Sequence, residues 1–309
     1  MYRGGHRKKM KCLITGGSGF IGSHIVDALI KKGHEVVVID NESSEVHAHF
    51  YFNERATYHK LDVADYQITR SIYDGIDYVF HCAAESRIEP CNLNPILAFK
   101  TNTLGTATVL QCAREAGVKK VMYSSTSSGY GLVNEPPLEE TMPDDCLNPY
   151  SVSKVSGEKI CRMYTKLFGV KSVVFRYFNV YGPREPLKGP YAPLIGLFLR
   201  QYRAKQPLTI VPDGTQRRDF IHVDDVVNAN ILAMEVDHDH YGEVFNVGSG
   251  TNHSVLELAA MISNNTVETG PRKGEAYITL ANNQKIRNIL GWAPKRNVID
   301  YVKEELNKE

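Results

Sequence analysis

The sequence contains no uninterrupted apolar stretch that approaches the ~20 residues needed to span a bilayer. It has no excess of one charge either, since 36 Lys and Arg residues against 35 Asp and Glu residues give a net charge of +1. No net field therefore draws the chain to nucleic acid or to an anionic membrane surface. Internal repeats are absent, and a content of 42% hydrophobic and 23% charged residues excludes a disordered chain, a collagen-like repeat and a pure coiled coil.

Cysteine is scarce and unpatterned. None of the six cysteines belongs to a C-x-x-C pair, the spacing typical of structural zinc sites and redox motifs. Apolar neighbours surround Cys12, Cys82 and Cys112, a setting typical of buried free thiols in a reducing compartment. We therefore expect a cytoplasmic protein without a metal site.

The length of 309 residues suggests two domains. Residues 1–10 (MYRGGHRKKM) are basic and lack the apolar core of a signal peptide, so we expect a disordered tail. We predict a first domain over residues 11–180 and a smaller one over residues 181–309, with the segment 220–250 partly returning to the first.

Short apolar runs alternate with helical periodicity from Lys11 onward. A helical pattern follows the first run up to Gly33, a long helical stretch covers 93–116, and another helix begins near Pro149. The runs expected as strands are KCLIT (11–15), EVVVID (35–40), DYVFH (77–81), KVMYS (120–124) and KSVVFR (171–176). Continuously apolar strands that alternate with helices predict a parallel sheet covered on both faces.

The pattern loosens after Gly182. A loop rich in proline and glycine covers 182–193, and only short elements follow, expected at 208–211, 219–223, 226–234, 244–247 and 255–262. We predict a smaller α/β domain stacked on the first, with a cleft between the two that suits a small molecule.

Glycines 16, 19 and 22 form G-x-x-G-x-x-G (TGGSGFIG, 15–22) between the first strand and the first helix. Such a turn lets a pyrophosphate approach the backbone, and the N–H groups at the helix start face the anion. Asp40 ends the second strand, where an acid accepts hydrogen bonds from the adenosine ribose and repels a 2′-phosphate. Together these features predict a Rossmann-type doubly wound sheet that binds NAD. Asp62 either contacts the adenine or caps a helix.

Tyr150 and Lys154 lie one turn apart on one face of the helix that Asn148 and Pro149 begin. A neighbouring ammonium, together with a positive nicotinamide ring, lowers the pKa of a phenol. We therefore expect Tyr150 to remove a proton from a sugar hydroxyl at neutral pH. The hydroxyl cluster 124–128 follows a strand at the end where such sheets bind ligands, and one of its hydroxyls could contact the reacting oxygen.

Further motifs support these interpretations. They are HCAA (81–84), NTLGT (102–106), SSTSSGYG (124–131), NPYSVSK (148–154), FRYFNVYGPR (175–184) and RRDFIHVDD (217–225). With the glycine loop and Asp40, the sequence from residue 11 to 294 resembles the extended short-chain dehydrogenases/reductases. The nearest group is the NAD-dependent nucleotide-sugar epimerases of the UDP-glucose 4-epimerase type.

This resemblance implies Tyr150 as catalytic base, Lys154 as the residue that tunes it and binds the nicotinamide ribose, and Thr126 as the hydroxyl that orients O4 of the sugar. Asn102 is either a residue near the cofactor or a buried helix-packing amide. The residues implied around a tightly bound NAD are Gly16, Gly19, Phe20, Ile21, Gly22, Asp40, Asn41, Asp62, Val63, Ala83, Ala84, Asn102, Tyr150 and Lys154. Those implied around the UDP-sugar are Ser86, Arg87, Ser127, Asn179, Arg184, Arg218, Arg272 and Glu275.

Related dehydratases carry Asp and Glu directly after the active-site Thr, where this chain has Ser127 and Ser128. Because hydroxyls of ordinary pKa are poor proton donors and acceptors, dehydration and decarboxylation are disfavoured. The resemblance therefore implies C4 epimerisation of a UDP-hexose through a 4-keto sugar, with NAD regenerated in each turnover.

The segment 182–193 resembles that of relatives acting on glucose, galactose or their N-acetyl forms, and Arg87 could contact a hydroxyl, a carboxylate or a cofactor phosphate. A UDP-glucuronate 4-epimerase and a nucleotide-4-keto-sugar reductase are the alternatives. A homodimer through the Tyr150 helix is also implied, with Val155, Ile160, Met163 and Leu167 as candidate contacts.

Overall fold

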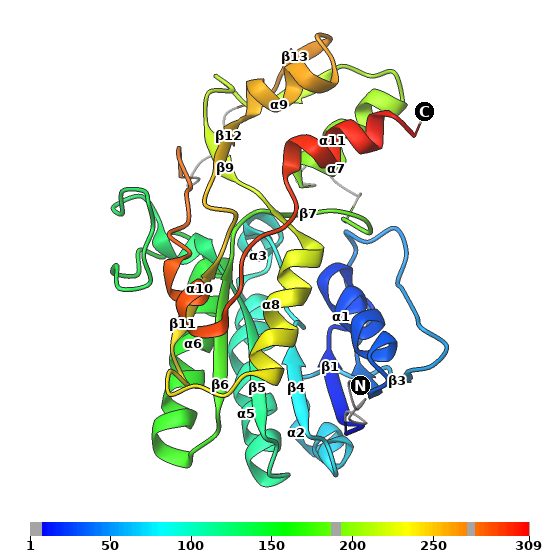
Figure 1. Ribbon diagram of the computed structural model, residues 1–309, viewed down its shortest axis with the longest axis vertical. Helices are drawn as coiled ribbons and strands as arrows, with labels where there is room; N and C mark the ends of the chain where they lie inside the picture. The colour runs from blue at the N-terminus through cyan, green and yellow to red at the C-terminus, as the bar shows by residue number, and fades with distance from the viewer. Residues whose placement is uncertain (1–7, 187–192, 271–275, 309) are drawn as a thin grey trace, which may run out of the picture.

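The computed structural model describes residues 8–186, 193–270 and 276–308. Its centre is a seven-stranded sheet in the order β11-β6-β5-β4-β1-β2-β3, in which every neighbouring pair is parallel (Figure 1). The strands are β1 (Lys11–Thr15), β2 (Glu35–Ile39), β3 (Thr57–His59), β4 (Tyr78–His81), β5 (Lys120–Thr126), β6 (Ser172–Tyr177) and β11 (Val244–Val247). The predicted doubly wound parallel sheet is confirmed.

Helices cover both faces of this sheet because its strands are apolar on both sides. In β1, Cys12 and Ile14 pack on the face covered by α1 (Phe20–Lys31), α8 (Val223–Glu235) and α10 (Gln284–Leu290). Leu13 faces the core on the opposite side of the sheet. This second core is completed by α2 (Tyr66–Thr69), the 3₁₀-helix η1 (Arg70–Tyr73), α5 (Gly105–Glu115) and α6 (Pro149–Phe168). This alternation of neighbouring residues between two cores explains the unbroken apolar runs.

The long helical stretch expected over 93–116 is confirmed from Pro95 to Glu115, where α4 (Pro95–Phe99), a π-helical segment η2 (Lys100–Leu104) and α5 follow one another without a break. Leu93 instead belongs to a separate helix, α3 (Ile88–Leu93). Asn94 ends α3 and its side chain accepts the N–H of Leu97, so a new helix starts with Pro95 in its first turn. A π-helical turn of this kind is frequent near functional sites.

A second group of elements lies above the carboxyl ends of the central strands (Figure 1). It contains the short strand pairs β7–β10, β9–β12 and β8–β13 and a core formed mainly by α7, α9 and α11. The elements are β7 (Val180–Tyr181), α7 (Leu194–Arg203), β8 (Leu208–Ile210), β9 (Arg217–Asp219), β10 (Ile221–His222), β12 (Asn252–Ser254), α9 (Val255–Ile262), β13 (Thr266–Glu268) and α11 (Val298–Leu306). This upper group faces the sheet edge where ligands bind in such folds.

All six cysteines are free, and four of them are buried. In the described part of the chain, no helix is long and apolar enough to cross a membrane.

Candidate functional site

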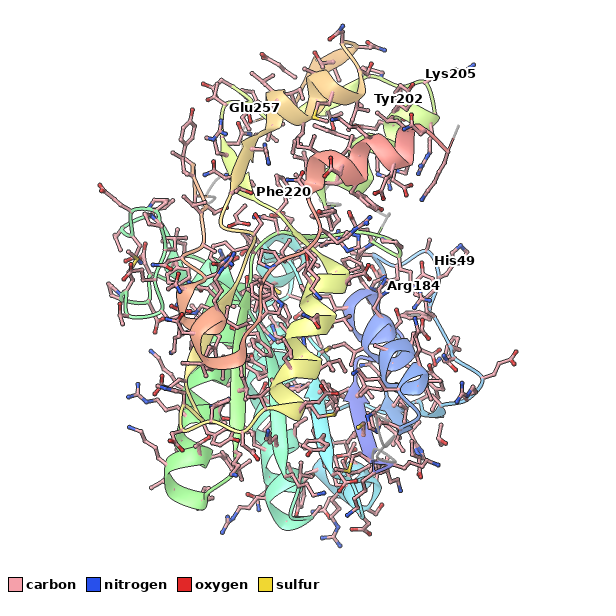
Figure 2. All side chains as sticks on the ribbon, viewed as in Figure 1. His49, Arg184, Tyr202, Lys205, Phe220 and Glu257 are labelled. Carbon is pink, nitrogen blue, oxygen red and sulfur yellow. The ribbon has the colours of Figure 1, made fainter. Side chains whose placement is uncertain are left out.

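A cavity of about 950 Å³ lies between the carboxyl ends of the central strands and the upper group. Its wall includes Gly16 and Thr126 from below and Thr209 and Phe220 from above. Figure 2 shows Phe220 at the level where the sheet meets the upper elements. This volume is at the upper end of the ~300–1,000 Å³ range of ligand pockets, which suits a dinucleotide together with a second ligand.

The glycine loop fits a pyrophosphate. Gly16 has a φ of +71°, and a Cβ there would lie 2.6 Å from the Ala83 nitrogen. A Cβ on Gly22 would lie 2.1 Å from the Gly16 carbonyl oxygen, so both positions require glycine. Gly19 begins α1 without a side-chain cap from any described residue, and it lines the cavity. The first N–H groups of α1 are thus available to an anion.

Asp40 follows β2 and also lines the cavity. Its carboxylate accepts the N–H of Ser18 at 2.9 Å and that of Glu42 at 2.8 Å, while burial raises the pKa of the carboxyl group. These bonds fix the acid beside the glycine loop, where a ribose would lie.

Three expected cofactor residues, Asp62, Asn102 and Lys154, do not line the cavity. Asp62 accepts the Ala64 N–H at 2.9 Å and pairs with Lys100 at 2.7 Å, while Asp65 is the residue that caps α2. Asn102 is buried and donates to the Glu85 carbonyl and the Ser153 hydroxyl, both at 2.9 Å. Asp62 therefore lies outside the cavity wall and does not cap α2, its contact with the adenine stays a prediction, and Asn102 packs η2 against α6.

Tyr150 and Thr126 both lie in the cavity wall. Asn148 caps α6 and Pro149 occupies its first turn, as the sequence predicts, and Ser151 completes a capping box with Asn148. This start places Tyr150 in the cavity wall, which also contains Thr126 at the end of β5. The phenol and the hydroxyl expected to orient the sugar therefore line the same space as the glycine loop.

The electrostatics of Tyr150 are those of the protein without NAD. Burial raises its pKa to about 12, and the groups that oppose this are the hydrogen bond from Thr126 and the charge of Arg87. Lys154 lies behind the cavity wall with its ammonium 4.4 Å from the Tyr123 ring centroid, and burial lowers its pKa to about 8. Lys154 is not among the groups that act on the Tyr150 pKa in the protein without NAD, so the lowering expected from Lys154 together with the nicotinamide ring stays a prediction.

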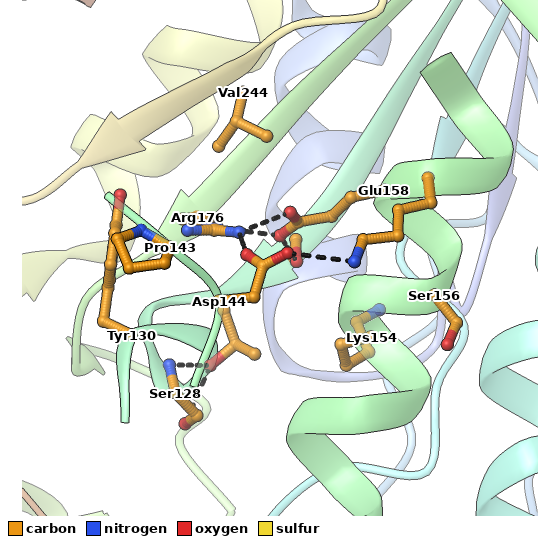
Figure 3. A network of polar contacts seen from close by, with 12 residues as sticks. Ser128, Tyr130, Pro143, Asp144, Lys154, Ser156, Glu158, Arg176 and Val244 are labelled. Atoms are coloured by element: carbon orange, nitrogen blue, oxygen red, sulfur yellow. Dashed lines mark hydrogen bonds and ion pairs between the residues drawn. The ribbon is translucent and has the colours of Figure 1, made fainter. Parts of the chain in front are cut away.

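A buried ionic network lies behind these residues (Figure 3). Arg176 on β6 pairs with Glu158 on α6 at 2.7 Å and with Asp144 at 2.6 Å. Glu158 also accepts the Ser125 hydroxyl at 2.5 Å, next to Thr126 in β5. The network thereby ties the helix that carries Tyr150 to the strand that carries Thr126.

Most of the expected substrate residues reach the cavity. Its wall contains Ser86, Arg87, Ser127, Asn179 and Arg218, as expected. Arg272 and Glu275 lie outside the described residues.

Arg184 is the exception. It pairs with Asp27 of α1 at 2.7 Å and lies over the Tyr51 ring, away from the cavity wall (Figure 2). Its backbone leaves β7 with a φ of +67°, which turns the side chain toward α1. Arg184 therefore does not line the cavity, and its expected contact with the substrate stays a prediction.

Sequence reasoning missed the cavity residues of the upper group and of the loop after β2. They include His47, Phe50, Leu194, Thr209, Val211, Gln216, Phe220 and Val255. Strands of two or three residues carry too short a pattern to be read, and the loop after β2 has no periodicity at all.

Comparisons with known proteins agree with this geometry. The model of the NAD dependent epimerase/dehydratase family matches residues 12–248. The crystal structure of UDP-glucose 4-epimerase from Thermotoga maritima with UDP-glucose has a TM-score of 0.89 and 34% sequence identity, and the match covers 97% of this chain and 99% of that chain.

Two curated relatives show the range of reactions. A UDP-glucose 4-epimerase from Streptococcus mutans is 32% identical over 316 residues, which cover 95% of this chain and 94% of the relative. A UDP-N-acetyl-alpha-D-glucosaminuronate decarboxylase from Bacillus cytotoxicus is 36% identical over 269 residues, which cover 81% of this chain and 78% of the relative.

Proposed function

The chain belongs to the NAD-dependent epimerase/dehydratase family, and from this premise we propose how its own residues carry out catalysis. The protein is an NAD-dependent enzyme that interconverts a UDP-sugar and its C4 epimer. The observation that carries our assignment is that Tyr150 and Thr126 line the cavity that the glycine loop also lines.

Tyr150 acts on O4 of the sugar. It removes the O4 proton as C4 is oxidised and returns a proton to O4 when C4 is reduced from its other face. When bound, NAD supplies the hydride acceptor and donor for C4, and a positive charge beside the phenol. Thr126, which lines the cavity together with Tyr150, holds the phenol and O4 in line for proton transfer.

Binding residues divide between the two sides of the cavity. We assign the pyrophosphate to the glycine loop, the adenosine ribose to Asp40, and the sugar nucleotide to Asn179 and Arg218. The expected domain division is supported in the same way: residues 11–180 with 220–250 hold NAD, and the rest of 181–309 mainly holds the nucleotide sugar. A sugar anchored by its diphosphate can turn so that either face of C4 meets the cofactor while O4 stays beside Tyr150.

Two serines favour epimerisation over elimination. Ser127 and Ser128 line the cavity directly after Thr126, and neither hydroxyl supplies the acid and base that removal of water requires. Ser128 instead donates its N–H to the Thr126 hydroxyl at 3.1 Å, which helps to fix that hydroxyl beside Tyr150.

The test uses purified NAD-loaded protein and UDP-hexoses without added reductant. We expect the C4 epimer to form, and Tyr150→Phe to lower kcat roughly 10²- to 10⁴-fold. Tyr164→Phe is the matched control, since Tyr164 lies on the same helix but bonds Gln111 at 3.0 Å outside the cavity. An active Tyr150→Phe variant, or NADH that accumulates with turnover, contradicts the proposal.

We also propose a homodimer. Leu93, Ile96 and Leu104 on α3, α4 and η2 are 79%, 78% and 53% exposed, and Leu167 on the adjoining α6 is 69% exposed. This apolar surface suits a second copy of the same helices. Val155 is buried against Gly129 and is unavailable for the role expected of it. Sedimentation should give a dimer that Ile96→Asp converts to a monomer; an unchanged mass contradicts the proposal.

A further inference from the structure

Asp219 is a fully buried acid that lies next to the cavity wall but not in it. It ends β9 and is 0% exposed. It does not line the cavity, although Arg218 before it and Phe220 after it both do. A buried carboxylate is costly unless hydrogen-bond donors surround it. The donors around Asp219 therefore show which parts of the chain this side chain holds together.

Four donors share the two oxygens of the Asp219 carboxylate. Oδ1 accepts the N–H and the hydroxyl of Ser249, both at 2.7 Å. Oδ2 accepts the N–H of Gly250 and that of Ala281, both at 3.0 Å. Because donors face both oxygens, Asp219 is held as an anion, and hydrogen bonds to an ionised acceptor are the strong ones. The carboxylate thereby joins the loop after β11 to the segment that precedes α10.

The backbone of Asp219 joins two residues of the cavity wall. Its N–H donates to the Thr279 hydroxyl at 3.1 Å, and its carbonyl accepts the side-chain amide of Asn179 at 2.7 Å. Asn179 and Thr279 line the cavity, as does Arg218. The three residues come from three separate segments, which lie after β6, within β9 and before α10. Asp219 adjoins or contacts each of them.

The cofactor side of the cavity is built from other elements. Asp40 follows β2, Thr126 ends β5 and Tyr150 lies at the start of α6. In the described part of the chain, none of these residues is hydrogen-bonded to Asp219. A change at Asp219 therefore acts on the upper side of the cavity and leaves the NAD side in place.

We propose that Asp219 is a positioning residue for the sugar nucleotide, because it holds Asn179, Arg218 and Thr279 in the arrangement that binds the UDP part of the substrate. The inference rests on the proposed function, which assigns the sugar nucleotide to Asn179 and Arg218. Asp219 itself does not line the cavity, so its loss weakens substrate binding and leaves the chemistry at C4 unchanged. A loss of this kind raises KM without lowering kcat.

The test uses Asp219→Asn, in which one carboxylate oxygen becomes an amide group that faces backbone N–H donors. Calorimetry with UDP on NAD-loaded protein gives the Kd. Epimer formation from the UDP-hexose that wild type accepts gives kcat and KM. We expect Kd and KM to rise roughly 10- to 100-fold, the scale for misplaced binding groups, with kcat within about twofold of wild type and NAD content unchanged.

Asp225→Asn is the matched control. Asp225 is a second buried carboxylate, which accepts the N–H groups of Lys295 and Arg296 at 2.9 Å and does not line the cavity. This variant should lose stability in thermal unfolding but keep the wild-type Kd for UDP. Ser249→Ala is a milder change that removes one of the four donors to Asp219, and it should raise the Kd for UDP roughly two- to tenfold.

Three results would overturn the inference. One is a wild-type Kd for UDP in folded Asp219→Asn, or in Ser249→Ala when Asp219→Asn does not fold. Another is an equal rise of Kd in Asp225→Asn. The third is a fall of kcat or of bound NAD in Asp219→Asn that exceeds the rise of Kd. The proposed function fails separately, since wild type that binds UDP and NAD but forms no epimer refutes it while the Kd values still decide the role of Asp219.

Discussion

Replacing Glu158 should lower the free energy of unfolding of the protein strongly, although the residue lies behind the cavity wall and not in it. Glu158 accepts hydrogen bonds from Arg176 at 2.9 and 2.7 Å and from Ser125 at 2.5 Å. Arg176 is only 3% exposed, so Glu158→Ala leaves a buried guanidinium with Asp144 as its remaining carboxylate partner. Breaking a buried pair from one side costs about 3–5 kcal/mol.

Two further variants separate this effect from simple loss of contacts. Lys159→Ala removes the exposed end of the same network, a pair with Asp144 at 3.2 Å in which Lys159 is 70% exposed, and should cost about 1 kcal/mol or less. The double variant Glu158→Met, Arg176→Met removes both buried charges and should be more stable than Glu158→Ala alone, because no charge is left unpaired.

Urea unfolding with NAD at one fixed saturating concentration measures all three variants. The fixed concentration matters because bound ligand adds to the apparent stability. Epimerase activity provides a second measurement, since Ser125 adjoins Thr126. A loss below ~1 kcal/mol in Glu158→Ala, or an equal loss in Lys159→Ala, would refute the reasoning.

Three other predictions concern the cofactor side and Lys154. Gly22→Ala should prevent stable folding, because its Cβ would lie 2.1 Å from a carbonyl oxygen. Gly19→Ala, whose Cβ would have no contact below 3.5 Å, should fold but bind less NAD. Circular dichroism measures the folding of both variants, and their NAD content measures cofactor binding. Asp40→Ala should lower the affinity for NAD about tenfold, and it should reduce the ratio of NAD affinity to NADP affinity; binding titrations with both cofactors measure this. Burial lowers the Lys154 pKa from 10.5 to about 8, so between these values the unfolded chain binds the proton and the folded chain does not. The free energy of unfolding of the wild type, relative to that of Lys154→Met, should therefore rise across this pH window by up to ~1.4 kcal/mol per pH unit. If the two proteins show the same pH dependence of unfolding, the prediction is wrong.

Most of the central sheet could be predicted because its strands leave a strong local pattern, whereas β3 (Thr57–His59), with only three residues, was not expected. Lys11–Thr15 and Val244–Val247 are strands with the bounds expected for those segments, and the capping box at Asn148 marks the start of α6. The glycine loop was also readable, since Gly16 and Gly22 are required by contacts with the chain itself. These features depend on neighbours in the sequence or on the sheet as a whole.

The remaining features depend on contacts between distant residues. Nothing near Asp62 in the sequence reveals that Lys100 binds it, and nothing near Arg184 reveals Asp27. The pKa of Tyr150 could not be inferred from the spacing of Tyr150 and Lys154, because it depends on how deeply the fold buries the phenol. Burial is a property of the assembled structure and has no local sequence signal.

The sheet order has a consequence for how the protein is made. Strand β11 lies at the edge beside β6, and α8 covers one face, yet both come late in the chain. When only the first 180 residues have left the ribosome, one apolar face of the growing sheet is exposed to solvent. Phe175 lies on this face and packs on Phe245 in the complete fold. The dinucleotide unit therefore closes only after Val247 has emerged, so its cofactor is captured near the end of synthesis, and a fragment ending at residue 180 should aggregate rather than bind NAD.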